Sequence, residues 1–296
     1  MVYYKLIEFV KSKGGYIWDS ITDVLNDNLQ FHYFDSDETI EGKTYTPDDE
    51  FATVYDELVI NKLKNDPRTL QAMESTQNDW WQVLLGESND FIRTNVIEFG
   101  RADFDFEQPS LFNQSFSKED KVNLYCFYNM RKHYFSGVSI FDSYKEFFEI
   151  ELKQISGRTT FFDFGCGPLT SGIAFNQTFK HNNEFSMKYV GIDISNAMLN
   201  KATEFSKSIL FKKNTEFRLL VSFKQLEENT LDEWFRVSNL VVLNFSYLFA
   251  NLNTEQINDL VNDVNQLVKK YPLNKYVLIY QNLYTDTIIS QGLKII

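Results

Sequence analysis

The second half of the chain alternates short apolar runs with longer segments whose apolar residues recur at helical spacing. The run from Leu240 to Leu243 is apolar at every position, which is typical of a strand buried on both faces of a parallel sheet. Strands that alternate with helices favour an α/β fold. Strands are predicted over 159–164, 187–192, 215–221, 239–243 and 275–280, and helices over 171–179, 196–210, 226–235 and 254–270.

The first half lacks this alternation, and its apolar spacing predicts mainly helices. Apolar residues fall on one face over 51–65, and Pro67 just beyond them is a typical helix stop. Ser117 is a suitable N-cap for a later helix, because its hydroxyl can accept from a free backbone N–H. That helix is predicted to end near Phe135, with Gly137 as its stop. Two further helices are predicted over 69–86 and 141–152.

The composition is that of a packed globular protein, with 43% hydrophobic and 24% charged residues. No apolar run reaches the roughly 18 residues of a membrane span, and the N-terminus lacks a signal-peptide pattern. Only Cys126 and Cys166 are cysteines, so we expect no disulfide framework and a cytoplasmic location. The three histidines, His32, His133 and His181, lack ligand spacing, so no metal is predicted.

The net charge of −12 comes from the first half of the chain. Residues 1–150 carry 14 basic and 27 acidic residues, whereas 151–296 carry 15 and 14. An acidic surface repels phosphate backbones, which argues against a nucleic-acid partner. Solubility is the alternative explanation for this charge.

A glycine turn follows the strand at 159–164 and leads into a helix. Asp163 comes two residues before Gly165 and four before Gly167, and glycines there let the backbone bend and approach a ligand. A dinucleotide fingerprint needs a third glycine where Thr170 stands; Gly172 comes two residues later. Asp163 would repel a pyrophosphate and suits a cationic amino acid moiety.

This segment resembles motif I of class I S-adenosylmethionine-dependent methyltransferases, and its Gly-x-Gly-Pro form resembles the loop of several small-molecule N-methyltransferases. The resemblance implies that Asp163 and the backbone of Gly165, Cys166 and Gly167 hold the methionine portion of S-adenosylmethionine, with S-adenosylhomocysteine as product.

The implied fold is α/β, a Rossmann-like class I methyltransferase sheet with a mainly α-helical N-terminal part. The S-adenosylmethionine-binding domain would span 151–296, and 1–150 would form a lid, substrate or interaction domain. Residues 287–296 could supply one more strand. The N-terminal part, a protein partner or a second copy of the chain would then cover the C-terminal sheet edge.

The strand predicted at 187–192 ends at a second acid, Asp193, which can accept hydrogen bonds from two ribose hydroxyls. The alternative is that Asp193 caps the next helix. By resemblance, Ile194 beside it and Ser222 after the third strand also contact the cofactor, with Phe223 as a packing surface.

The segment after the fourth strand resembles motif IV, (Asp/Asn)-Pro-Pro-(Tyr/Phe/Trp), at Asn244 and Tyr247, whereas Phe245 and Ser246 replace both prolines. By this resemblance Asn244 would contact the cofactor and would also accept from an acceptor –NH group, and Tyr247 would stack on a flat substrate. The alternative is an ordinary strand end.

Tyr128 and Arg131, on the helix before the first strand, would close over the cofactor by resemblance to relatives; at helical spacing they are otherwise core residues. The function predicted is methyl transfer to an N or O atom of a small molecule or protein. The alternatives are a non-catalytic S-adenosylmethionine- or S-adenosylhomocysteine-binding subunit or sensor, and a nucleic-acid amino-methyltransferase.

Overall fold

The structure is a computed structural model. It describes residues 2–3, 30–31, 48–70, 104–105, 116–154, 158–183, 185–226, 228–235, 240–248 and 252–281. Most of the helix predicted over 69–86 and all of the strand suggested at 287–296 lie outside these residues.

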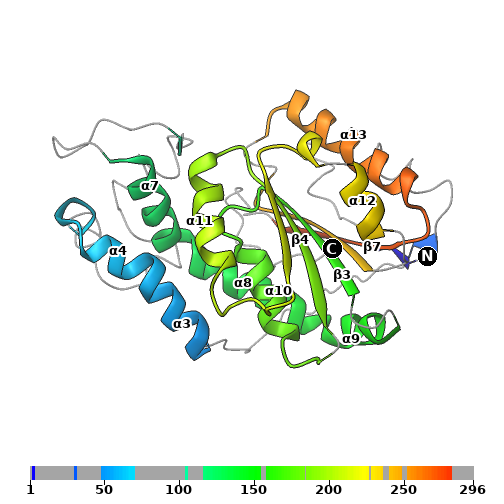
Figure 1. Ribbon diagram of the computed structural model, residues 1–296, viewed down its shortest axis with the longest axis horizontal. Helices are drawn as coiled ribbons and strands as arrows, with labels where there is room; N and C mark the ends of the chain where they lie inside the picture. Colours follow the sequence, from blue (N-terminus) through cyan, green and yellow to red (C-terminus); the bar gives the residue numbers. More distant parts are fainter. Residues whose placement is uncertain are drawn as a thin grey trace, which may run out of the picture.

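A five-stranded parallel sheet forms the centre of the molecule, with strand order β5-β4-β3-β6-β7 (Figure 1). This confirms the prediction of an α/β fold with a parallel sheet. The strand order reverses between β3 and β6, which is where open α/β sheets leave a crevice for ligands. The strands are β3 (Arg158–Phe164), β4 (Ser186–Ile192), β5 (Glu216–Leu220), β6 (Leu240–Ser246) and β7 (Lys275–Gln281).

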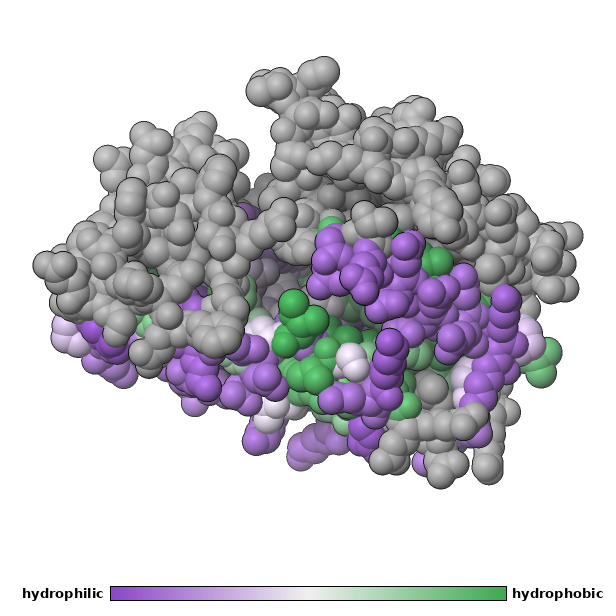
Figure 2. Space-filling model, turned by 90° about the horizontal axis from the view of Figure 1, so that it is seen from above, coloured by the Kyte–Doolittle hydropathy of each residue, from purple (hydrophilic) through white to green (hydrophobic). Residues whose placement is uncertain are grey.

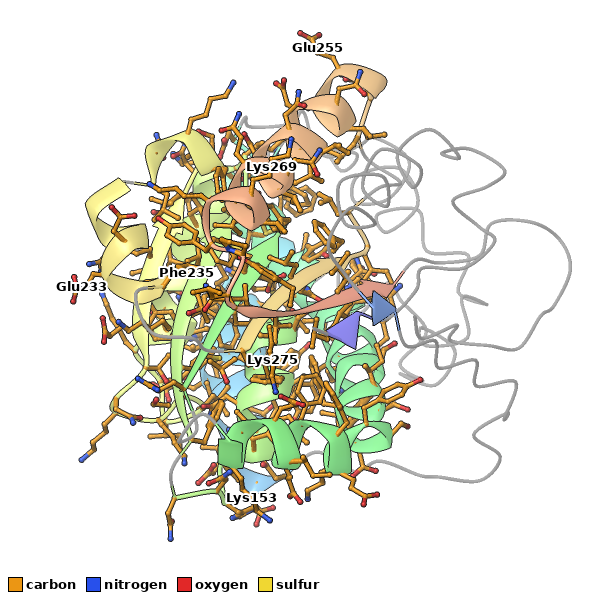
Figure 3. All side chains as sticks on the ribbon, turned by 90° about the vertical axis from the view of Figure 1, so that its right-hand side faces the viewer. Lys153, Glu233, Phe235, Glu255, Lys269 and Lys275 are labelled. Atoms are coloured by element: carbon orange, nitrogen blue, oxygen red, sulfur yellow. The ribbon has the colours of Figure 1, made fainter. Side chains whose placement is uncertain are left out.

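Helices cover both faces of the sheet, and each face has its own apolar core. On one face lie α8 (Arg131–Ser143), α9 (Lys145–Gln154), α10 (Thr170–Phe179) and α11 (Asn196–Ser206). On the other lie α12 (Glu228–Phe235) and α13 (Thr254–Lys270), and the single turn η4 (Phe223–Gln225) precedes α12. Figure 3 shows Glu255 and Lys269 near opposite ends of α13, where their charges complement the helix dipole.

A further helical layer packs outside α8, α10 and α11 (Figure 1). Ser117 begins its second helix with a capping box, as the sequence predicts: its hydroxyl accepts from the backbone N–H of Asp120 at 3.1 Å. Both runs of helix contain a π-helical segment. The layer consists of α3 (Asp49–Tyr55), η1 (Asp56–Ile60), α4 (Asn61–Lys64), α7 (Lys118–Tyr125) and η3 (Cys126–Met130).

The prediction that Gly137 stops a helix is wrong. Helix α8 continues through Gly137 to Ser143, and α9 begins only at Lys145. A Cβ atom on Gly137 would lie 3.0 Å from the Cβ of Ala174 in α10. The absence of a side chain at Gly137 therefore allows α8 and α10 to approach closely.

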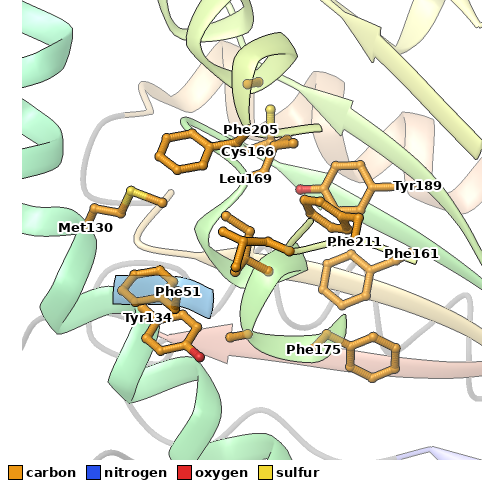
Figure 4. Close-up of a cluster of buried hydrophobic side chains, with 14 of the residues drawn as sticks. Phe51, Met130, Tyr134, Phe161, Cys166, Leu169, Phe175, Tyr189, Phe205 and Phe211 are labelled. Carbon is orange, nitrogen blue, oxygen red and sulfur yellow. The ribbon is translucent and has the colours of Figure 1, made fainter. Parts of the chain in front are cut away.

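One apolar core joins the helical layer to the sheet (Figure 4). Phe51 of α3 stacks on Tyr134 of α8 with ring centroids 3.8 Å apart, and Phe141 of α8 meets Phe175 of α10 edge to face. The domain division at residue 150 stays a prediction. At the last strand of the sheet, Lys275 at the start of β7 faces α9 (Figure 3) and donates to Glu151 at 2.6 Å.

Two short strands lie beside the last strand of the sheet. β1 (Val2–Tyr3) and β2 (Gln30–Phe31) pair in parallel, and β1 lies against β7. The N-terminal end of the chain therefore lies at the β7 edge of the sheet, for which the sequence predicts a cover by the N-terminal part or by a partner.

Within the described ranges, no helix combines the length and apolarity that crossing a membrane demands.

Candidate functional site

The glycine turn after β3 adopts backbone angles that its sequence predicts. Gly165 and Gly167 have φ values of 72° and 48°, and Leu169 also has a positive φ, of 65°. The N–H groups of Gly165 and Cys166 both donate to the carbonyl oxygen of Ile192, at 2.7 and 3.0 Å. The turn is thus fixed to the carboxyl end of β4.

Every N–H group of this turn is used within the chain. Gly167 donates to the Asp193 carboxylate at 2.9 Å, and Leu169 donates to the Cys166 carbonyl at 2.9 Å. Pro168 has no N–H group to offer. A phosphate-binding loop presents such groups to its anion, and this turn presents none between residues 165 and 169.

Asp163 lies at the end of β3, and only 2% of its surface is exposed. Its Oδ1 accepts from Asn244 Nδ2 at 2.7 Å, and its Oδ2 accepts from the Tyr189 hydroxyl. Burial raises the pKa of the Asp163 carboxyl to about 6, although both hydrogen bonds act against this rise. Among the described residues, no lysine, arginine or histidine forms an ion pair with it.

Asn244 lies opposite Asp163 across β3 and β6, with 1% of its surface exposed. Its Oδ1 accepts from the Ser246 hydroxyl at 2.8 Å, so both polar ends of the amide are bonded inside the protein. β6 extends three residues beyond the predicted strand end, which places Asn244 within the strand. Contact with a methyl acceptor stays a prediction. The structure gives Asn244 another role, which is to hold Asp163.

Asp193 follows β4, and its side chain is half-buried. Besides the Gly167 N–H, it accepts from the Ser195 N–H at 2.9 Å. Burial is the main cause of the raised pKa of Asp193, and these N–H donors oppose it. The N-cap of α11 is Ser195, whose hydroxyl accepts from the Met198 N–H. Ile194, beside Asp193, is 76% exposed.

Asp105, which the sequence did not single out, binds the start of α11. Its carboxylate accepts from the N–H groups of Ala197 and Asn196 at 2.8 and 3.0 Å, and from the Ser195 hydroxyl at 3.1 Å. Burial opposes ionisation of Asp105, but these donors outweigh it and lower its pKa. An acid followed by scattered aromatic residues gave no signal for a contact 90 residues away.

Replacing Asp105 with alanine is expected to lower the free energy of unfolding at pH 7 by about 1 kcal/mol, because three donors at a helix start lose their acceptor. The lowered pKa means that this contribution is present above the unfolded-state pKa near 3.8 and is lost as pH falls through the folded-state pKa. Urea unfolding at pH 7 and pH 3 measures it. An equal deficit at both pH values would contradict an ionic contact.

Tyr247 follows β6 and has a positive φ of 59°. Its ring stacks on His133 of α8 with centroids 3.8 Å apart and planes 13° apart. Its hydroxyl lies 3.1 Å from the Ser136 hydroxyl. Tyr247 therefore joins the loop after β6 to α8, a partner that no local sequence pattern indicates.

The other predicted site residues make their described contacts with neighbours outside the proposed ligand site. Tyr128 is buried in η3, and Arg131 lies over the Tyr55 ring at 5.3 Å, on the side of the helical layer. Ser222 is half-buried at the start of η4, and its carbonyl accepts from the Gln225 N–H. Cys166 is buried in the same apolar core as Phe205 (Figure 4), and burial raises the pKa of its thiol.

Seen from above, the described surface carries a group of hydrophobic side chains beside a larger hydrophilic area (Figure 2). The fold is that of a doubly wound α/β protein, and Asp163 and Asp193 lie at the carboxyl ends of β3 and β4. Comparison with models of known families finds no match, and no curated protein is similar to this sequence.

Proposed function

We propose that this protein binds S-adenosylmethionine at the carboxyl edge of β3 and β4 and transfers its methyl group to an N or O atom of a small molecule or protein. The observation that carries the proposal is the buried Asp163 carboxylate, which has no cationic partner among the described residues. A buried charge without a partner is unfavourable, so its retention at a ligand-binding edge is explained by a cationic ligand.

The hydrogen-bonding groups at this edge suit a cationic ligand and disfavour a nucleotide phosphate. The turn has no free N–H group between residues 165 and 169, and Asp105 occupies the first N–H groups of α11. Three carboxylates, those of Asp105, Asp163 and Asp193, belong to the same edge of the molecule. A dinucleotide pyrophosphate would meet acceptors where it needs donors.

The turn also leaves room for a ligand. A Cβ atom on Gly167 would meet nothing within 4 Å, so the space beside its backbone is open. Asp163 and this backbone would hold the methionine portion, and Asp193 would accept from ribose hydroxyls with its free lone pairs. Ile194 offers an exposed apolar surface for the flat adenine, and Ser222, at the start of η4, would supply a polar contact. Tyr128 and Arg131 would approach from the helical layer.

S-Adenosylmethionine supplies a methyl group already activated by its sulfonium charge. The protein therefore needs placement more than acid–base groups, and placement alone can supply roughly 7–11 kcal/mol of a barrier. Asp163 and Asp193 would orient the two ends of the cofactor. The acidic first half favours a cationic or neutral small molecule, or a basic protein, as the methyl acceptor.

Calorimetry with S-adenosylmethionine and S-adenosylhomocysteine tests the proposal, and absence of binding for both would refute it. A second candidate, a non-catalytic binding subunit or sensor, is favoured by the internal bonding of Asn244, which leaves that amide committed to Asp163 and Ser246. Product formation over a panel of amines, proteins and RNA separates the two candidates and also tests a nucleic-acid acceptor.

Replacing Gly167 with alanine is expected to weaken binding of S-adenosylhomocysteine at least tenfold, because the new methyl group enters the open space beside the turn. The positive φ adds a stability loss of about 1 kcal/mol. Gly137→Ala, whose Cβ would crowd Ala174 rather than the turn, is the comparison for general destabilisation and should lower stability without a matching loss of affinity. Calorimetry measures the affinity and urea unfolding the stability; equal affinity in Gly167→Ala would place the ligand elsewhere.

A further inference from the structure

A histidine with an unpaired ring nitrogen lies beside the proposed site. No described residue forms a hydrogen bond with Nε2 of His133, and this atom is shielded from solvent although the residue as a whole is only half-buried. Buried polar atoms in native proteins are nearly always paired, so an unpaired one calls for an explanation such as a missing ligand. The proposed function gives His133 no role.

Contacts through Tyr247 place this histidine at the edge of the sheet that carries the site. Tyr247 directly follows β6, and its ring stacks on the His133 imidazole. The next residue, Leu248, touches the glycine turn: a Cβ atom on Gly165 would lie 2.9 Å from Leu248 Cδ1. The chain thus runs from the turn, through Leu248 and Tyr247, to His133.

The imidazole is held in one orientation from two sides. Tyr247 stacks on one face, and its hydroxyl is anchored to Ser136, one helical turn beyond His133. Tyr125 meets the ring edge to face at 6.5 Å. Tyr247 adopts a left-handed backbone conformation that non-glycine residues rarely take, and such conformations concentrate at functional sites.

The imidazole of His133 is neutral, which allows it to accept a hydrogen bond. Burial, with a smaller contribution from Lys132, lowers the pKa of His133 to about 3, so the imidazole is neutral at pH 7. A neutral imidazole has one nitrogen with a free lone pair.

We propose that His133 is a catalytic residue on the acceptor side of the site, where Nε2 accepts a hydrogen bond from the N–H or O–H group that receives the methyl. Tyr247 and Ser136 are its positioning residues. This inference rests on the proposed function. It also names the acceptor class: a nucleophile that still carries a proton, such as an amine, a ring N–H or a hydroxyl.

The chemical step is balanced with the groups named. The lone pair of the acceptor atom forms a bond to the methyl carbon, and the carbon–sulfur bond breaks with its electron pair going to sulfur, which leaves neutral S-adenosylhomocysteine. The positive charge moves from sulfur to the acceptor atom, which then gives its proton to water. Nε2 orients the acceptor through the hydrogen bond from that proton and stays neutral.

The test compares two ligands that differ at the position of the transferred methyl. Sinefungin carries an ammonium group where S-adenosylmethionine carries its methylsulfonium, whereas S-adenosylhomocysteine has neither. His133→Phe keeps a flat ring for Tyr247 and removes Nε2. Calorimetry should show sinefungin affinity falling about tenfold in this variant, with S-adenosylhomocysteine affinity within twofold of wild type. His181→Phe, at an exposed histidine after α10, is the matched control and should change neither.

Equal losses for both ligands would assign His133 to cofactor binding or to packing, and unchanged affinities would remove it from the acceptor side; either result overturns the inference. If the wild type binds neither ligand, the proposed function itself fails. Nitrogen NMR of the wild-type protein provides a measurement that needs no variant. The Nε2 resonance of His133 should shift with sinefungin and stay in place with S-adenosylhomocysteine, and no shift with bound sinefungin would overturn the inference.

Discussion

At pH 8, Asp163→Asn is expected to be about 3 kcal/mol more stable to unfolding than the wild type, while its affinity for S-adenosylmethionine falls at least tenfold. The substitution keeps the shape and both hydrogen bonds, since the new carbonyl can accept from Asn244 and the new amide can donate to the Tyr189 oxygen. It removes a buried negative charge. Binding suffers because the ligand's cationic group loses its counter-charge.

The pH dependence follows from the pKa of Asp163, which is about 6 in the folded protein against 3.8 for the ordinary group. Between pH 4 and pH 6 the folded state keeps a proton that the unfolded state gives up, so wild-type stability falls as pH rises through this window. A shift of about two pKa units corresponds to about 3 kcal/mol. Below pH 4 the two proteins should be nearly equally stable.

Urea unfolding at pH 4 and pH 8 measures this difference. Asp259→Asn, at an exposed position of α13, is the matched control and should show no such pH-dependent gain. If Asp163→Asn is less stable than the wild type at pH 8, the carboxylate is satisfied by its two hydrogen bonds and needs no ligand to explain it.

The second large effect is expected at Gly172, in the first turn of α10. A Cβ atom there would lie 2.2 Å from Cε2 of Tyr189, a ring that is completely buried. The ring cannot swing away without breaking its hydrogen bond to Asp163. Gly172→Ala should therefore lower the free energy of unfolding by about 3 kcal/mol, because overpacking forces a buried ring or the helix to move.

Urea unfolding of Gly172→Ala beside Gly167→Ala gives the comparison, because a Cβ at Gly167 meets nothing within 4 Å. Gly172→Ala should lose far more free energy of unfolding, and Gly167→Ala far more affinity for S-adenosylhomocysteine. A loss below 1 kcal/mol at Gly172 would mean that α10 can shift on the sheet.

The sequence predicts the five strands well because each is a short segment rich in apolar or β-branched residues, and the run from Leu240 to Leu243 is apolar throughout, which is a local property. The prediction of a helix stop at Gly137 failed because the role of this glycine is not local. A glycine near an expected helix end is a typical stop signal, and only the position of Ala174 shows that it allows two helices to approach closely. The acids at the ends of β3 and β4 were found because strand, acid and turn follow each other in sequence.

The partners of the site residues could not be predicted in the same way. Asn244 meets Asp163 from 81 positions away, and Asp105 reaches α11 across 91 or more. These contacts depend on the strand order and on how the helical layer folds back, neither of which leaves a local pattern. Tyr189 reads as an ordinary strand residue, yet its hydroxyl binds the central carboxylate.

The core shared by α8, α10 and the sheet limits how this protein can open. Gly137 brings α8 against Ala174, and Phe141 of α8 packs on Phe175 in the same cluster. Swinging α8 away would expose these side chains to water at about 25 cal/mol for each Å² of apolar surface. The energy that holds α8 in place is thus part of the energy that holds the sheet together. If a ligand binds at the proposed site, it would therefore enter through the loops at the strand ends, with α8 as a fixed wall of that site.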